Sequence, residues 1–247
     1  MMPLALFRSR DFSGASLVTL FLYTALVGAL FFLPFNLIQV QGYSPTAAGA
    51  SLLPFIVIMF LLSRYAGGLL PRYGARPLLT AGPLIAACGY ALLTLPGVGG
   101  SYWRTFFVPV CVLGLGMAAS VAPLTTTIMG TAGVASGINN AISRVAGVLA
   151  VALFGVILTH AFGSHLDRRL SALDLDNNIR QSIDAQKMRL AAITVPSGTP
   201  PRLAARIRGD ISESYVAGFR WVMAAAAILS VLSALSSWLM IAPKGRQ

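Results

Sequence analysis

Six long apolar stretches, each holding at most one charged residue, dominate this sequence of 247 residues. A helix of about 20 apolar residues crosses a hydrocarbon layer of about 30 Å. Within lipid, the backbone N–H and C=O groups must be hydrogen-bonded inside the structure, and runs of this length favour helices. We therefore expect an all-α membrane protein with a bundle of six transmembrane helices. The predicted spans cover about residues 12–40, 47–70, 77–95, 102–129, 138–162 and 216–241.

The composition excludes a soluble domain and argues against nucleic acid as a partner. Hydrophobic residues make up 56% of the chain and charged residues only 10%, whereas soluble domains carry about 25% charged residues. The formal net charge of +11 would favour nucleic acid if the basic residues were clustered. They are scattered between the spans, where basic residues act as topology signals and as anchors at lipid headgroups. We therefore expect the lipid bilayer, and no nucleic acid, as a partner.

The distribution of basic residues predicts the orientation in the membrane. With six spans, both termini lie on the same side. The short connections on the other side carry only Arg104. Because short loops rich in Lys and Arg stay in the cytoplasm, we expect a multi-pass protein of the cell (inner) membrane with both termini in the cytoplasm. The basic residues on the terminal side are Arg8, Arg10, Arg72, Arg76, Lys244 and Arg246.

The connection before the last span is long and polar. Residues 163–215 hold eight basic and six acidic residues, and we expect them to form an extracytoplasmic loop. The predicted division is therefore five transmembrane helices in residues 1–162, this loop, and a sixth helix with a cytoplasmic tail in residues 216–247. Apolar residues at helical spacing indicate short amphipathic helices in the loop, lying on the membrane surface or on the bundle. These residues are Leu166, Leu170, Leu173, Ile179 and Ile183.

A short motif follows the second span. Residues 67–79 form a glycine-containing turn with two arginines, which the positive-inside rule alone would also explain. The spacing resembles the loop signature of the major facilitator superfamily. Pro71 stands where the full signature has an aspartate and Ala75 where it has a basic residue, and such degenerate copies are typical of the second half of these transporters. The matching positions are Gly67, Leu69, Arg72, Gly74, Arg76 and Leu79.

Three further segments are similar to the EmrB/QacA drug-resistance subfamily of that superfamily. They are residues 41–49, 133–147 and 215–220, so the resemblance covers nearly the whole chain and matches the last six of the subfamily's fourteen spans. It implies the C-terminal half of a major facilitator fold and proton-driven export of amphipathic or cationic drug-like compounds. The substrate site of such a transporter lies between two six-helix bundles, and this chain supplies one of them.

Asn140 and Arg144 in the fifth predicted span are candidate substrate-binding residues. They are four residues apart and therefore share a helix face. A charged side chain within a span is costly, so its presence needs a reason. The reason is either a partner across the bundle or an anionic group of the substrate, and the sequence leaves both open.

A second candidate group lies near the end of the first span. Phe31 and Phe35 flank the amide-bearing residues Asn36 and Gln39, and aromatic rings beside amides are typical of a drug-binding cavity. Alternatively, the phenylalanines face lipid and Asn36 forms a hydrogen bond with a neighbouring helix.

The placement of the acidic residues bears on energy coupling. Asp11 and six residues between Asp167 and Glu213 account for all seven, so no carboxylate lies within a predicted span. Proton carriers are usually intramembrane Asp or Glu. If the coupling is to protons, the titrating carboxylate belongs to a missing N-terminal bundle or to a partner chain. We expect no metal and no cofactor, because the sequence has neither a metal-ligand cluster nor a nucleotide-binding glycine loop.

Two other functions are compatible with six spans. An intramembrane serine protease needs a base within hydrogen-bond reach of its serine, but Ser136 and His160 lie at opposite ends of the fifth span, about 36 Å apart at 1.5 Å per residue. We therefore expect no enzymatic activity. The other alternative is a truncated product, or a membrane subunit without transport activity of its own.

Overall fold

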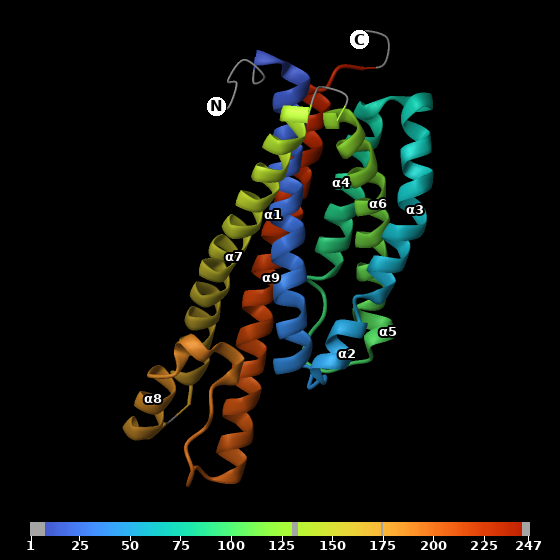
Figure 1. Ribbon diagram of the computed structural model, residues 1–247. Coiled ribbons are helices and arrows are strands. Elements are labelled where there is room, and N and C mark those ends of the chain that lie inside the picture. Colours follow the sequence, from blue (N-terminus) through green and yellow to red (C-terminus); the bar gives the residue numbers. More distant parts are fainter. Residues whose placement is uncertain (1–7, 130–132, 174, 244–247) are drawn as a thin grey trace.

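The computed structural model describes residues 8–129, 133–173 and 175–243, and its regular elements there are helices (Figure 1). This confirms the predicted all-α fold. The six long helices run side by side, and the chain begins and ends at the same end of the bundle (Figure 1). Lys244 and Arg246, used above to predict the orientation, lie outside the described residues. The long helices are α1 (Arg10–Gln39), α3 (Leu53–Tyr73), α4 (Ala75–Leu92), α6 (Phe107–Met129), α7 (Gly133–Leu170) and α9 (Pro201–Met240).

Five helical segments are long and apolar enough to cross a membrane by length and composition. The remaining predicted span, 77–95, corresponds to α4, which is not among them. It is short at 18 residues, and Arg76 and Pro77 occupy its first turn, so its apolar content is diluted. It nevertheless lies inside the bundle, packed against α6 and α9. The five segments are Arg10–Gln39, Pro45–Tyr73, Phe107–Thr127, Ser136–Leu170 and Pro201–Met240.

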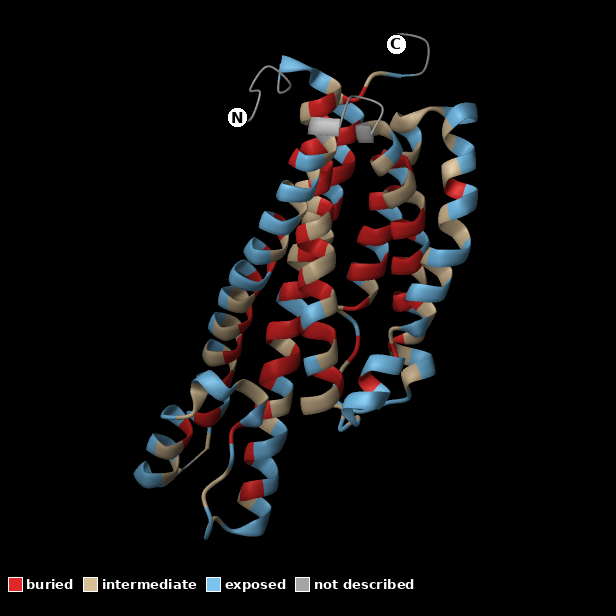
Figure 2. Ribbon diagram, viewed as in Figure 1, coloured by how far each residue is buried: buried red, intermediate tan, exposed pale blue. Residues whose placement is uncertain are grey.

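The bundle consists of two groups of three helices. In one group α1, α7 and α9 pack against one another, in the other α6 packs against α3 and α4, and the contact of α4 with α9 joins the groups. Buried residues lie on the sides of α1, α4, α6 and α9 that face each other (Figure 2). In contrast, α3 and α7 are exposed along much of their length (Figure 2). These two helices therefore offer their surfaces to lipid or to another bundle.

Small residues bring α4 and α6 into backbone contact. A Cβ atom added to Gly116 would lie 2.8 Å from both the Cα of Ala86 and the carbonyl oxygen of Gly82, and one added to Gly82 would collide with the hydroxyl of Ser120. Without a hydrophobic driving force between helices in lipid, such close approach supplies the packing energy. This contact therefore fixes the distance between the two helices.

Prolines divide two of the predicted spans. The span predicted at 47–70 is split into α2 (Pro45–Ala50) and α3, and the span predicted at 102–129 into α5 (Tyr102–Thr105) and α6. Proline has no N–H, so Pro54 cannot donate to the carbonyl of Ala50, nor Pro109 to that of Thr105, and the helical hydrogen bonding is interrupted there.

The segment predicted as a loop, residues 163–215, is largely helical. α7 continues to Leu170 and α9 already begins at Pro201, with α8 (Asn177–Asp184) and a 3-10 helix, η2 (Lys187–Ala192), between them. We call this segment the polar hairpin. It projects from the end of the bundle opposite the termini (Figure 1). Leu166, Leu170 and Ile183 are fully buried within it, and η2 contacts both α7 and α9.

Ion pairs join the two arms of the polar hairpin. On α7, Arg169 pairs with Asp210 of α9 at 3.1 Å and with Glu213 at 2.5 Å. Lys187 pairs with Asp167 at 2.6 Å and with Asp184 at 2.9 Å. Partly exposed pairs of this kind contribute little individually, typically below about 1 kcal/mol. The pairs of Arg169 link α7 with α9, and those of Lys187 link η2 with α7 and α8.

The ammonium group of Lys187 stays charged in this setting. Partial burial lowers its pKa, but hydrogen bonds and charge from Asp167 and Asp184 outweigh burial, and the pKa is raised above the ordinary lysine value. The stabilisation from this pairing is therefore fully present below the ordinary lysine pKa, and it is lost only as the pH rises through the raised value.

Gln41 and Arg220 hold the loop between α4 and α5. The side-chain amide of Gln41 donates to the carbonyl of Gly97 and accepts from the N–H of Gly99, each at 2.8 Å. Arg220 donates to the carbonyls of Leu95 (3.4 Å) and Pro96 (3.2 Å), just past the end of α4. Both residues belong to segments that resemble the drug-resistance subfamily, and the loop contacts give them a structural role.

Replacing Gln41 with alanine is expected to loosen this loop. Two hydrogen bonds to the loop are lost, at about 1 kcal/mol each, so amide hydrogen exchange at residues 97–100 should accelerate roughly tenfold or more. Hydrogen exchange followed by mass spectrometry measures this directly. Gln181→Ala, on the exposed surface of α8, is the control and should leave the loop unchanged. Equal exchange in both variants would show that Gln41 does not hold this loop.

Candidate functional site

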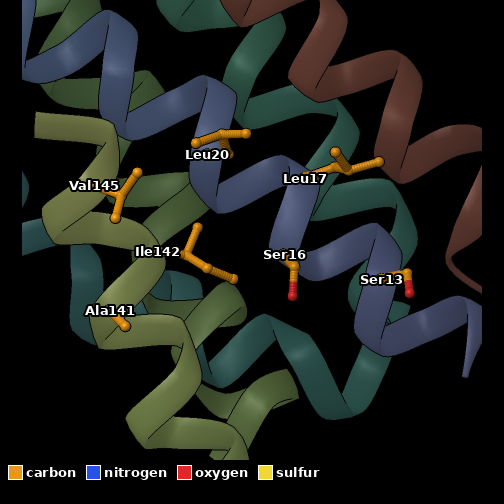
Figure 3. Close-up of a pocket in the computed structure, with 7 residues that line it drawn as sticks. All are labelled: Ser13, Ser16, Leu17, Leu20, Ala141, Ile142 and Val145. Atoms are coloured by element: carbon orange, nitrogen blue, oxygen red, sulfur yellow. The ribbon is translucent and has the colours of Figure 1, made fainter. Parts of the chain in front are cut away.

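An apolar groove of about 540 Å³ separates α1 from α7 in the half of the bundle nearest the termini (Figure 3). Side chains of both helices project toward the space between them (Figure 3). Binding pockets for small molecules are typically of this size and mostly apolar, with few polar groups. The groove is therefore our candidate functional site. It is lined by Ser13, Ser16, Leu17, Leu20, Ala141, Ile142 and Val145.

A buried hydrogen bond ties α1 to α7 beside the groove. The hydroxyl of Thr19, which is fully buried, lies 2.6 Å from Oδ1 of Asn139 and 2.9 Å from the carbonyl of Ala15. Sequence analysis had drawn attention to Asn140, its neighbour. Adjacent residues point about 100° apart on a helix, and here Asn139 turns toward α1 while Asn140 is exposed. Only the rotation of α7 about its axis distinguishes the two roles.

Asn140 and Arg144 lie on one exposed face of α7, next to the groove-lining residues Ala141 and Val145. In the described part of the chain, no hydrogen bond or ion pair engages the guanidinium of Arg144. The predicted partner across the bundle is therefore not seen among the described residues, and the other interpretation, an anionic group of the substrate, stays a prediction.

The structure separates the four candidates at the end of α1. Phe31 and Phe35 are about 40% exposed, with ring centroids 5.3 Å apart. Asn36 is buried, and its Oδ1 accepts a long hydrogen bond (3.4 Å) from Gln41, the residue that holds the loop between α4 and α5. Gln39 instead lines a 400 Å³ pocket between α1 and the polar hairpin. These residues do not form a single cavity with each other.

The loop motif fastens the turn between α3 and α4 to the end of α9. Gly74 is the only residue between the two helices, with φ of +83°. The guanidinium of Arg76 lies 4.2 Å above the ring of Trp238, a cation–π arrangement. Arg72 occupies the last turn of α3, Gly67 faces α6, and Leu69 is partly exposed. Nothing in the motif's own sequence indicates the partner Trp238.

The acidic residue outside the polar hairpin has a structural partner. Oδ1 of Asp11, in the first turn of α1, accepts a hydrogen bond of 2.8 Å from the N–H of Ala242, directly after α9. A carboxylate in a first turn also interacts favourably with the helix dipole. Asp11 therefore joins the two ends of the described chain.

The sequence model of the Major Facilitator Superfamily matches residues 2–151, more than half of the chain. The chain belongs to the Major Facilitator Superfamily. Its members are transporters, so the enzyme alternatives fall away, as predicted, and the six-helix arrangement is that of one facilitator bundle. Ser136 and His160 lie far apart along α7, so they do not form a serine–histidine pair.

Several relatives of this facilitator chain are drug-resistance proteins. The tetracenomycin C resistance and export protein of Streptomyces glaucescens is 28% identical over 246 residues, which is 95% of this chain and 45% of that protein. The multidrug resistance protein Stp of Mycobacterium tuberculosis is 26% identical over 96% of this chain and 46% of its own length. The puromycin resistance protein pur8 of Streptomyces alboniger is 32% identical over 67% of this chain. The chain spans about half the length of the curated relatives it matches.

Proposed function

We propose that this chain forms the C-terminal six-helix bundle of a proton-coupled multidrug exporter of the EmrB/QacA type. The observation that carries the proposal is the alignment of nearly the whole chain with about half of proteins named for drug resistance and export. In a facilitator of two bundles the substrate binds between them. The chain then contributes one wall of the site, and a first bundle contributes the other.

The groove between α1 and α7 is the proposed substrate-facing wall. Its apolar lining suits the rings of amphipathic or cationic drug-like compounds, and Asn140 stands beside it as a polar contact. The fixed charge of Arg144 would repel a cationic substrate, so we assign Arg144 to a carboxylate of the first bundle. Such a pair would be broken when the carboxylate binds a proton or a cationic drug.

Proton coupling then depends on a group outside this chain. None of the seven acidic residues falls in a predicted span, and Asp11 is engaged at the junction of α1 and α9. We propose that the titrating carboxylate lies in the first bundle or a partner chain, with both termini of this chain in the cytoplasm. The alternative, a subunit without transport activity of its own, differs in one outcome of the test below.

Replacing Ala141 with phenylalanine is expected to block export. The ring would occupy the groove, and lost contacts in a binding pocket reduce turnover roughly tenfold or more. The measurement is efflux of a fluorescent cation, with and without a protonophore, from cells that lack other exporters and express this chain together with a first bundle. Ala152→Phe, on the exposed surface of the same helix, is the matched control and should retain efflux.

Three outcomes of this measurement separate the alternatives. Protonophore-sensitive efflux that Ala141→Phe alone abolishes supports the groove as the substrate wall. Equal efflux in the two variants contradicts it. No efflux even when a first bundle is coexpressed favours the alternative, a subunit without transport activity of its own.

A further inference from the structure

A second cleft, of about 400 Å³, lies between α7 and α9 at the end of the bundle near the polar hairpin. It has a different character from the groove, because imidazole, guanidinium and indole groups line it. Its walls include Ile157, His160, Ala161, His165, Arg168 and Trp221. None of these residues takes part in the proposed substrate wall.

The residues that α7 contributes change from apolar to cationic along the helix. They recur every three or four positions and so form one stripe, which begins with Ile157 and Ala161, continues with His165 and ends with the exposed Arg168. The stripe runs along α7 from the bundle into the polar hairpin, to which His165 and Arg168 belong. This is the polarity of a membrane lipid, whose chains point to the bilayer centre and whose headgroup points outward.

Two tryptophans place the cleft at the level of lipid headgroups. Trp221 and Trp238 are both exposed on α9, by 60% and 55%. They are separated by about 26 Å at 1.5 Å per residue, close to the hydrocarbon thickness of about 30 Å. Exposed tryptophans of membrane helices gather at the two interfaces. Between them, Ile228 and Leu235 are exposed on α9, which provides an apolar surface for acyl chains.

The charge in the cleft favours an anion. The neighbouring carboxylates are engaged elsewhere: Asp167 binds Lys187, and Asp210 and Glu213 bind Arg169. In the described part of the chain no ion pair or hydrogen bond engages the guanidinium of Arg168, and no carboxylate lines the cleft. A guanidinium matches the geometry of a phosphate and forms charge-assisted hydrogen bonds with it.

We propose that this cleft binds the headgroup of an anionic phospholipid. Arg168 contacts the phosphate, His165 and His160 offer ring N–H donors, and Trp221 covers the glycerol region while the acyl chains follow the exposed surface of α9. A zwitterionic choline headgroup would bring its own cation next to Arg168. The apolar inner part of the cleft distinguishes a lipid from free phosphate.

Thermal unfolding of the purified protein in detergent tests this proposal. Phosphatidylglycerol is expected to raise Tm by about 2–4 °C, whereas phosphatidylcholine with the same chains, and inorganic phosphate, should each have less than half that effect. Arg168→Gln should abolish the shift. Arg206→Gln, an exposed arginine of α9 outside the cleft, should retain it.

A second measurement keeps the test decisive if Arg168→Gln fails to fold. Phosphatidylglycerol with brominated chains should quench the fluorescence of Trp221. The part of the quenching that is lost in Trp221→Phe reports on this residue, and that part should fall in His165→Gln. Equal shifts with both lipids, an equal shift with inorganic phosphate, or a full shift in Arg168→Gln would each overturn the proposal.

Discussion

Replacing Gly116 with valine is expected to prevent the bundle from assembling. The Cβ of any larger residue would lie 2.8 Å from the Cα of Ala86 and from the carbonyl of Gly82. These are backbone atoms, so no rotamer change relieves the collision and α4 must move away from α6. Overpacking of a core typically costs 1–3 kcal/mol, and separation of two helix backbones should exceed about 3 kcal/mol. Size-exclusion chromatography of the solubilised protein and its Tm measure the loss.

Gly155→Val is the matched control for this prediction. Gly155 lies within α7, and an added Cβ there meets no atom within 4 Å. Valine and glycine have similar costs in a helix interior. This variant should therefore elute as one species in size-exclusion chromatography, and its Tm should equal that of the parent protein. If Gly116→Val behaved in the same way, the inference that α4 and α6 are in backbone contact at Gly116 would be contradicted.

Replacing Gly74 with valine is the second large change. Gly74 has φ of +83° and ψ of 173°, a region that is essentially reserved for glycine. It is also the only residue between α3 and α4, so the chain has no neighbouring loop residue to absorb the strain. We expect a loss of roughly 3 kcal/mol, measured as a lower Tm, and a turn that no longer aligns Arg76 with Trp238.

Two observations check the origin of this effect. Gly68→Val, in the exposed helical part of the same motif where an added Cβ meets nothing within 4 Å, should be tolerated. Fluorescence of Trp238 should change in Gly74→Val and not in Gly68→Val, because only the first variant displaces Arg76 from its ring. A tolerated Gly74→Val would show that this turn is free to adopt another conformation.

The positions of the membrane helices followed from the sequence because lipid imposes a strong rule on it. Long uncharged runs have few alternatives to a transmembrane helix, and the named runs became α1, α3, α4, α6, α7 and α9. The ends of α7 and α9 did not follow. Residues Asp167 to Arg169 are charged and read as the edge of a loop, yet Leu166 and Leu170 remain buried against the partner helix. The packing of α7 against α9 extends both helices, and a local sequence pattern does not report such a contact.

The candidate site was predicted less completely because a site depends on helix rotation and long-range contacts. Sequence spacing placed Asn140 and Arg144 on one face of the helix but did not give the direction of that face. In the structure this face is exposed, and Asn139 instead contacts Thr19. Sequence spacing also grouped Asn36 with the phenylalanines, although Asn36 is buried and bonds to Gln41. The pairing of α1 with α7 that forms the groove brings together residues more than 120 positions apart, and no local signal encodes that distance.

The continuation of α7 and α9 past the rest of the bundle makes the polar hairpin a long rigid projection. About 22 Å of α9 precede the level of Val216 at 1.5 Å per residue, and the ion pairs of Arg169 with Asp210 and Glu213 tie this part of α9 to α7. Over this length, each degree of tilt of the bundle displaces the tip of the polar hairpin by about 0.4 Å. Small rotations within the membrane are thus amplified at an accessible surface, where a pair of spin labels would read them as a change in distance.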